Sequence, residues 1–272
     1  MVTGTVSTLS VICMGISMLL AFAIPIILLI RYRRKGADFL PFFIGCAVML
    51  IFALILESLI HQLALGSPAG ETIRGNLWLY AVYGGLMAGL FEETGRFIAF
   101  KTVLKKKQDN DMNALMYGAG HGGFEVLAIL GVTMLNNLIW SILINTGSLS
   151  LITSQVPANM MEQVNATFQA LTETPPWQFL LGIVERCFAV IMQIALSVLV
   201  WFAAKKKGRG FLFPAAILLH AVVDGVTVIL TGIGLSSLAV EGAVGAMAIL
   251  LALLSKSVWN REHKDTEAMT ET

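Results

Sequence analysis

The sequence predicts an all-α bundle of about seven transmembrane helices. Of its 272 residues, 57% are hydrophobic and 13% are charged, whereas a soluble domain carries about 25% charged residues. Seven apolar stretches are long enough to cross a bilayer, which takes roughly 20 helical residues. None of them alternates apolar and polar residues with a period of two, as the strands of a membrane β-barrel do. We therefore expect a single integral membrane domain over residues 1–272, embedded in a lipid bilayer.

The basic residues orient the expected helices, which lie at about 8–30, 39–65, 77–100, 113–145, 177–203, 211–232 and 238–256. Fifteen of the eighteen Lys and Arg residues follow the first, third, fifth and seventh stretches. Cytoplasmic loops carry an excess of these residues. We therefore expect the N-terminus outside and the C-terminus in the cytoplasm, which agrees with an odd number of helices. A bacterial cell (plasma) membrane is the expected location.

Little of the chain lies outside the membrane in this prediction. The longest outer loop covers about 147–176, and the apolar residues from Met161 to Leu171 within it recur with helical spacing. This pattern predicts a short helix on the outer interface. Residues 257–272 form a polar cytoplasmic tail that we expect to be disordered. The formal net charge of +1 offers no basic surface for nucleic acid, so we expect no nucleic-acid partner.

Several ionisable residues lie inside the expected membrane helices, where each charge costs roughly 2.5–3.5 kcal/mol. They are Glu57, His61, Glu92, Glu93, Arg96, His121, Glu125, Glu185, Arg186, His220 and Asp224. Four pairs among them are spaced four residues apart, which places both side chains on one helix face. The pairs are Glu57 and His61, Glu92 and Arg96, His121 and Glu125, and His220 and Asp224. Such residues must face one another or a wet cavity, and they are candidate functional residues.

Counting residues from the cytoplasmic helix ends sorts these groups by depth. Glu92, His121 and His220 all lie roughly 12–14 Å deep at 1.5 Å per residue. Glu125 and Asp224 lie one turn deeper. The remaining four, at 57, 61, 185 and 186, fall in the outer half. We expect those four to form a separate structural network that includes an ion pair between Glu57 and Arg186.

Two histidines beside paired glutamates suit hydrolysis. A glutamate can take a proton from water, while an imidazole polarises a carbonyl or stabilises the oxyanion. Alternatively, His121, His220 and Glu92 bind a zinc ion and leave its fourth position open for water. The two mechanisms use the same residues, so both stay open.

The first of three motifs is Phe91-Glu92-Glu93-Thr94-Gly95-Arg96. It resembles the Glu-Glu-x-x-(x)-Arg motif of the CAAX prenyl protease and bacteriocin-processing superfamily of membrane proteases. Here the arginine follows the glutamates after two residues, whereas the prenyl-protease branch has three. This difference leaves open which glutamate is the base, and a prenylated CAAX protein is not the expected substrate.

The second and third motifs lie on later helices. Tyr117-x-x-x-His121 resembles the second motif of the superfamily, which usually begins with Phe, and His220-x-x-x-Asp224 resembles the third. Glu125 is an addition to the pattern. The order of the motifs and the run from His121 to Glu125 resemble the YhfC branch, a group of intramembrane metalloproteases. The motif-bearing core covers about residues 77–232.

The resemblance implies a hydrolase that cleaves membrane proteins or lipidated peptides near the cytoplasmic membrane face. One of Glu92 and Glu93 would activate water, and Arg96 would keep the pair ionised. His121 and His220 would bind a metal, which would be zinc, or the oxyanion. Asp224 would orient His220.

Two other classes of function remain as alternatives. A proton- or divalent-cation-coupled transporter also carries acidic and histidine side chains in its bundle. Transporters often show two related halves, and we find no internal repeat in this sequence. A catalytically idle scaffold or immunity factor is the third class, and the presence of both glutamates and both histidines argues against it.

Overall fold

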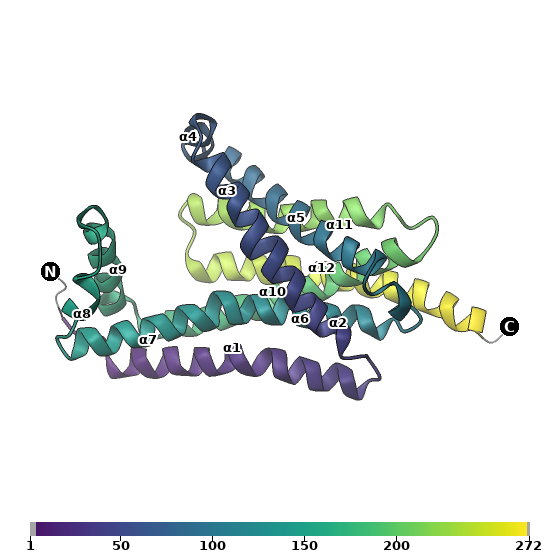
Figure 1. The fold of residues 1–272 in the computed structure, drawn as a ribbon, viewed down its shortest axis with the longest axis horizontal. Helices are drawn as coiled ribbons and strands as arrows, with labels where there is room; N and C mark the ends of the chain where they lie inside the picture. The colour runs from purple at the N-terminus through teal and green to yellow at the C-terminus, as the bar shows by residue number, and fades with distance from the viewer. Residues whose placement is uncertain (1–3, 271–272) are drawn as a thin grey trace. The chain divides into compact units, whose positions relative to one another are not determined.

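The computed structural model describes residues 4–270, with side chains described as far as His263. The described residues form helices, turns and loops, and no strand occurs among them (Figure 1). The long helical segments, in chain order, are α1 (Thr8–Arg34), α2 (Leu40–Val48) continued by η1 (Met49–Glu57) and α3 (Ser58–Leu65), α5 (Leu77–Lys101), α6 (Met112–Val126) continued by η3 (Leu127–Gly131) and α7 (Val132–Asn145), α10 (Pro176–Lys205), α11 (Leu212–Gly232) and α12 (Ser237–Thr270). The short helices are α4 (Pro68–Arg74), η2 (Lys105–Lys107), α8 (Ser150–Thr153), η4 (Ala158–Met160) and α9 (Met161–Glu173).

The all-α, polytopic prediction is confirmed. Six helices of the described residues are long and apolar enough to cross a membrane, and each coincides with an expected stretch. The remaining expected stretch, the third at about 77–100, is α5, which is less apolar because it carries Glu92, Glu93 and Arg96. Its 25 residues still extend about 37 Å at 1.5 Å per residue. The count of seven spans and the orientation of the termini stay predictions.

Contacts divide the chain into two compact units. The first contains residues up to Ile24 together with Val126–Arg186, and the second contains Pro25–Glu125 together with Cys187–Thr272. Helices α1 and α10 and the continuous segment from α6 to α7 contribute residues to both units. The single integral domain stays a prediction.

In the first unit, α9 lies within the loop for which a short helix is predicted. Phe168 and Leu171 of α9 are buried, and the Phe168 ring packs edge-on against Trp140 with centroids 5.6 Å apart. The apolar face of α9 is therefore covered by protein. Its place at the outer interface stays a prediction.

The second unit holds its helices together through close backbone contacts at glycines. A Cβ atom on Gly85 of α5 would lie 2.3 Å from the Ala221 carbonyl oxygen of α11. A Cβ atom on Gly45 of α2 would lie 2.3 Å from the Tyr117 carbonyl oxygen of α6. Small residues allow such approach, which favours dispersion contacts between membrane helices. These crossings bring α5, α6 and α11, the three motif-bearing helices, into one unit.

We expect Gly120→Ala to destabilise the protein. The added Cβ atom would lie 1.9 Å from the carbonyl oxygen of Phe42, so α2 and α6 would have to separate. Overpacking of this kind costs about 1–3 kcal/mol. Gly84→Ala is the matched control, because a Cβ atom there meets nothing within 4 Å. Thermal unfolding in detergent measures both variants, and equal midpoints would contradict the close α2–α6 contact.

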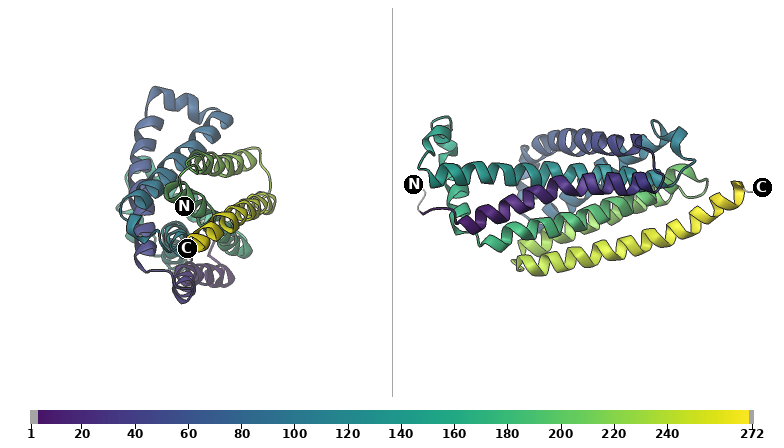
Figure 2. Two further views of the ribbon diagram at one scale, coloured as in Figure 1. Left: turned by 90° about the vertical axis from the view of Figure 1, so that its right-hand side faces the viewer. Right: turned by 90° about the horizontal axis from the view of Figure 1, so that it is seen from below.

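The expectation of a disordered tail from residue 257 onward is wrong over most of its length. Helix α12 continues without a break to Thr270 (Figure 2), and residues 271–272 lie outside the described part. The reason is a set of tertiary contacts made by two consecutive residues of α12. Glu262 forms an ion pair with Arg209 at 2.7 Å, and His263 Nδ1 lies 3.0 Å from Asp111 Oδ2. These contacts hold the helix against the ends of α10 and α6.

Candidate active site

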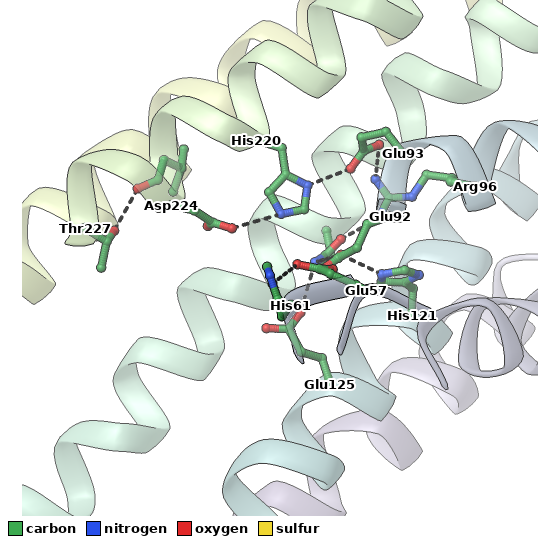
Figure 3. Close-up of polar contacts among 12 residues, drawn as sticks. Glu57, His61, Glu92, Glu93, Arg96, His121, Glu125, His220, Asp224 and Thr227 are labelled. Atoms are coloured by element: carbon green, nitrogen blue, oxygen red, sulfur yellow. Dashed lines mark hydrogen bonds and ion pairs between the residues drawn. The ribbon is translucent and has the colours of Figure 1, made fainter. Parts of the chain in front are cut away.

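The predicted site residues meet in the second unit, in one buried network (Figure 3). Three helices carry the residues of the motifs, and α10 adds one more side chain. The network consists of Glu92, Glu93 and Arg96 of α5, His121 and Glu125 of α6, Gln193 of α10, and His220 and Asp224 of α11. The spacing of four residues along α5, α6 and α11 thus predicts the shared face correctly.

Each of the two carboxylate oxygens of Glu93 has a hydrogen-bond partner. Its Oε2 accepts a hydrogen bond from Nη1 of Arg96, and its Oε1 lies 2.8 Å from Nδ1 of His220. The side chains of Glu93 and Arg96 have no exposed surface. Glu93 therefore holds Arg96 and His220 in place and has no oxygen directed to an open space.

Glu92 differs from its neighbour in one respect. Both of its hydrogen bonds reach the same oxygen, Oε2, which lies 2.9 Å from His121 Nε2 and 2.9 Å from Gln193 Nε2. No hydrogen bond from the described residues reaches Oε1. The Glu92 side chain keeps 9% of its surface exposed, whereas that of Glu93 keeps none.

The two histidines lie on different helices and each contacts one glutamate of the pair. His121 is fully buried, and its Nδ1 has no hydrogen-bond partner among the described residues. His220 has a carboxylate at each ring nitrogen, since Nε2 lies 3.4 Å from Asp224 Oδ2. Asp224 is the most exposed side chain of the network, at 36%. The His220 Nε2 atom therefore lies beside the most exposed side chain of the network.

Gln193 is part of the network, although no pattern of charged residues in the sequence predicts it. Its amide oxygen accepts from Nη2 of Arg96, and its Nε2 donates to Glu92 Oε2 and to Glu125 Oε2, the latter at 3.0 Å. Gln193 has no ionisable side chain and no charged residue four positions away, so it falls outside the search for intramembrane charges. The feature of the sequence that could have indicated Gln193 is the presence of a polar amide within the apolar run from Cys187 to Ala204.

The position of Glu57 contradicts the prediction that the outer charged residues form a network separate from the site. Figure 3 shows Glu57 beside Glu92 rather than in a distant network, and Glu57 interacts electrostatically with Glu92, His220 and Asp224. It also lies 3.1 Å from His61 Nε2, and His61 Nδ1 lies 3.0 Å from the Tyr83 hydroxyl. Counting residues along a helix ignores helix tilt and the wider turn of a π-helix. Glu57 ends such a segment, η1, and π-helical turns occur frequently at functional sites.

The other two residues of the expected outer network belong to the first unit. Arg186 forms an ion pair with its neighbour Glu185. The ion pair expected between Glu57 and Arg186 stays a prediction.

The donor chemistry of the cluster suits zinc, but the arrangement of the side chains does not. Imidazole nitrogens and carboxylate oxygens are normal zinc ligands. Among the described residues, however, no group of three or more His, Cys, Asp or Glu side chains converges around one point. His121 instead contacts Glu92, and His220 contacts Glu93 and Asp224. As placed, these three residues do not form a metal site, and zinc ligation by them stays a prediction.

Fold and site together define an integral membrane protein with a buried glutamate–histidine–arginine network. The family model described as YhfC intramembrane metalloprotease matches residues 20–244, and the chain belongs to this family. It is 34% identical over 222 residues to the protein called "Uncharacterized membrane protein YhfC" of Bacillus subtilis (strain 168). The match covers 80% of this chain and 84% of that relative. No solved structure matches the chain.

Proposed function

We propose that the protein is an intramembrane peptidase that hydrolyses peptide bonds near the cytoplasmic membrane face. The observation that carries this proposal is the asymmetry of the glutamate pair. Glu92 presents Oε1 at the accessible edge of the site, beside two imidazoles, whereas Glu93 is closed off by Arg96 and His220. Glu92 is therefore the base, which chooses between the two candidates of the motif.

In the proposed reaction, Glu92 Oε1 takes a proton from a water molecule. The resulting hydroxide attacks the carbonyl carbon of the peptide bond, and His220 Nε2 polarises the carbonyl oxygen once the substrate displaces Asp224 from this nitrogen. When the C–N bond breaks, the proton held by Glu92 passes to the departing amine. Both the proton and the electron pair are thus accounted for within the site.

The surrounding residues hold these groups. Arg96 and Glu93 form the buried ion pair that anchors the His220 ring, and Asp224 faces its second nitrogen. His121 fixes one oxygen of Glu92. The depth of the site and the lipid-facing helices around it favour a membrane protein or a lipidated peptide as the substrate class.

A zinc-dependent version of the reaction stays in the proposal as the alternative. A zinc ion would supply Lewis-acid polarisation and a more acidic water. His121, His220 and Glu92 offer the donors, after rearrangement of their present contacts. The family description supports a metal, and the placement of the side chains supports the metal-free reaction.

We expect the purified protein in liposomes to cleave at least one member of a panel of membrane-spanning and lipidated peptides. The variants are Glu92→Gln, Glu93→Gln, His121→Ala and His220→Ala, and mass spectrometry of the products measures cleavage. Cleavage that survives all four substitutions would overturn the mechanism. Absence of cleavage by the wild-type protein would favour a transporter or a non-enzymatic scaffold.

The same assay separates the two chemical versions. Cleavage that is lost with a chelator and restored by zinc assigns the reaction to a metal. Cleavage that is unchanged by a chelator, in protein shown to be free of metal by elemental analysis, assigns it to Glu92 and the imidazoles alone.

A further inference from the structure

Both polar atoms of the Gln193 amide, the oxygen and the nitrogen, form hydrogen bonds within the network. The residue lies on α10, and 1% of its surface is exposed. Its oxygen accepts a hydrogen bond from Arg96, and its nitrogen donates to two carboxylates, Glu92 at 2.9 Å and Glu125 at 3.0 Å. An amide nitrogen has two hydrogens to donate. Gln193 therefore contacts residues of α5 and α6 through one planar group.

The surroundings permit only one orientation of this amide. If the group were turned by 180°, its NH2 would face the guanidinium of Arg96, which can only donate. Its oxygen would then face two carboxylates, which accept when they are ionised. The observed orientation places a donor between two groups that would otherwise repel each other across the site.

The hydrogen bond to Glu92 also leaves the second oxygen of that carboxylate without a donor among the described residues. His121 and Gln193 both donate to Oε2. A rotation of the Glu92 carboxylate that placed Oε1 on these donors would simply exchange the two oxygens, so one oxygen always remains at the accessible edge. A carboxylate with a single donor has a wider range of orientations than one held by two.

We propose that Gln193 is a positioning residue, which holds Glu92 in the orientation needed to take a proton from water and links it to Arg96 and Glu125. This inference rests on the proposed function, since it assigns the support of the proposed base. It also gives Glu125 a role, as the second acceptor that fixes the plane of the amide. Groups that orient metal ligands change activity by about 10- to 100-fold when they are removed, and we expect an effect of the same size from a group that orients a general base.

The substitutions at this position separate hydrogen bonding from shape. Gln193→Met keeps the length of the side chain and removes its donors and acceptor. Gln193→Asn keeps the amide but shortens its reach by one methylene. Gln193→Glu keeps the shape and places a third carboxyl beside Glu92 and Glu125. Ser197→Ala is the matched control on the same helix, because Ser197 Oγ donates to the backbone carbonyl of Gln193 and contacts no charged group.

We expect Gln193→Met to lower kcat about 10- to 100-fold on a peptide that the wild-type protein cleaves, with KM changed less than about threefold. Gln193→Asn should lower kcat by nearly the same factor, and Ser197→Ala should keep kcat within a factor of two of the wild-type value. For Gln193→Glu we expect a rate that rises as the pH is lowered from 8 to 6, because only a protonated carboxyl can donate to its neighbours. Melting midpoints are measured alongside the rates to identify any variant that unfolds.

A kcat of folded Gln193→Met equal to that of the wild type would overturn the proposal. So would a loss that appears in KM alone, or a pH profile of Gln193→Glu that follows the wild type. A wild-type protein that cleaves no peptide overturns the proposed function itself and the positioning role with it. A double-mutant cycle of Gln193→Met and Glu125→Met, which removes the acceptor, on thermal unfolding checks the contact separately, and additive changes in the melting midpoint would show that the amide does not bind Glu125.

Discussion

Glu92→Gln is expected to abolish hydrolysis while leaving the fold intact. The new amide can direct its oxygen toward the donors His121 and Gln193, which now bind Oε2, and its NH2 toward the accessible edge. Every buried contact is then retained, but the group can no longer take a proton. General bases contribute about 10²- to 10⁴-fold, so we expect a loss of that size in kcat with an unchanged melting midpoint.

Glu93→Gln is expected to behave differently, and the contrast tests the choice of base. The substitution removes the charge that compensates Arg96, and both side chains are fully buried. An uncompensated buried charge costs about 3–5 kcal/mol. We expect the free energy of unfolding to fall by an amount near the lower end of this range, because the carboxylate of Glu92 lies close to Arg96 and compensates part of its charge. Turnover and thermal unfolding are measured for both variants. Glu162→Gln, an exposed acid on α9, is the control. If Glu92→Gln kept its activity and Glu93→Gln lost it without destabilisation, Glu93 would be the base.

Arg96→Met is expected to destabilise the protein more than any other single change in the site. Arg96 has no exposed side-chain surface, donates to Glu93 and Gln193, and lies near the Tyr117 ring. Its loss leaves a buried carboxylate without a cation, which costs about 3–5 kcal/mol. Arg96→Lys should recover part of this stability, because one ammonium group restores the charge but cannot reproduce the fork that reaches both partners.

A double variant distinguishes lost charge compensation from lost packing. We expect Arg96→Met with Glu93→Gln to be more stable than Arg96→Met alone, because neither buried charge is then left unpaired. The midpoint of thermal unfolding and the amount of protein in membranes are the measurements. Arg74→Met on the exposed helix α4 is the control. Additive losses of stability in the double variant would contradict the ion pair.

Local spacing was sufficient to predict which charged residues share a helix face. Glu92 with Arg96, His121 with Glu125, and His220 with Asp224 each lie one turn apart because the α-helix repeats every 3.6 residues. The cost of burying a charge in lipid then requires that these faces meet. The contacts of His121 with Glu92 and of His220 with Glu93 agree with this expectation.

Residues with no such local signal were missed or misplaced. Gln193 has no charge, and its three partners lie on α5 and α6 rather than on its own helix. Glu57 was assigned to another layer because a count of residues along one helix carries no information on tilt or π-helical turns. The C-terminal residues read as a polar tail, although Glu262 and His263 have partners at Arg209 and Asp111.

The class of protein, the helices and most charged residues of the site are all predicted from the amino-acid sequence. Apolar length, helical period and the cost of intramembrane charge are properties of a single segment, so they can be evaluated without a fold. The packing of the helices shows that Glu92, and not Glu93, keeps an oxygen without a hydrogen bond from the described residues, and that Gln193 and Glu57 lie beside it. Hydrogen bonds between helices depend on the crossing and tilt of the helices, which arise from packing at positions such as Gly45 and Gly85 far from the residues that they align.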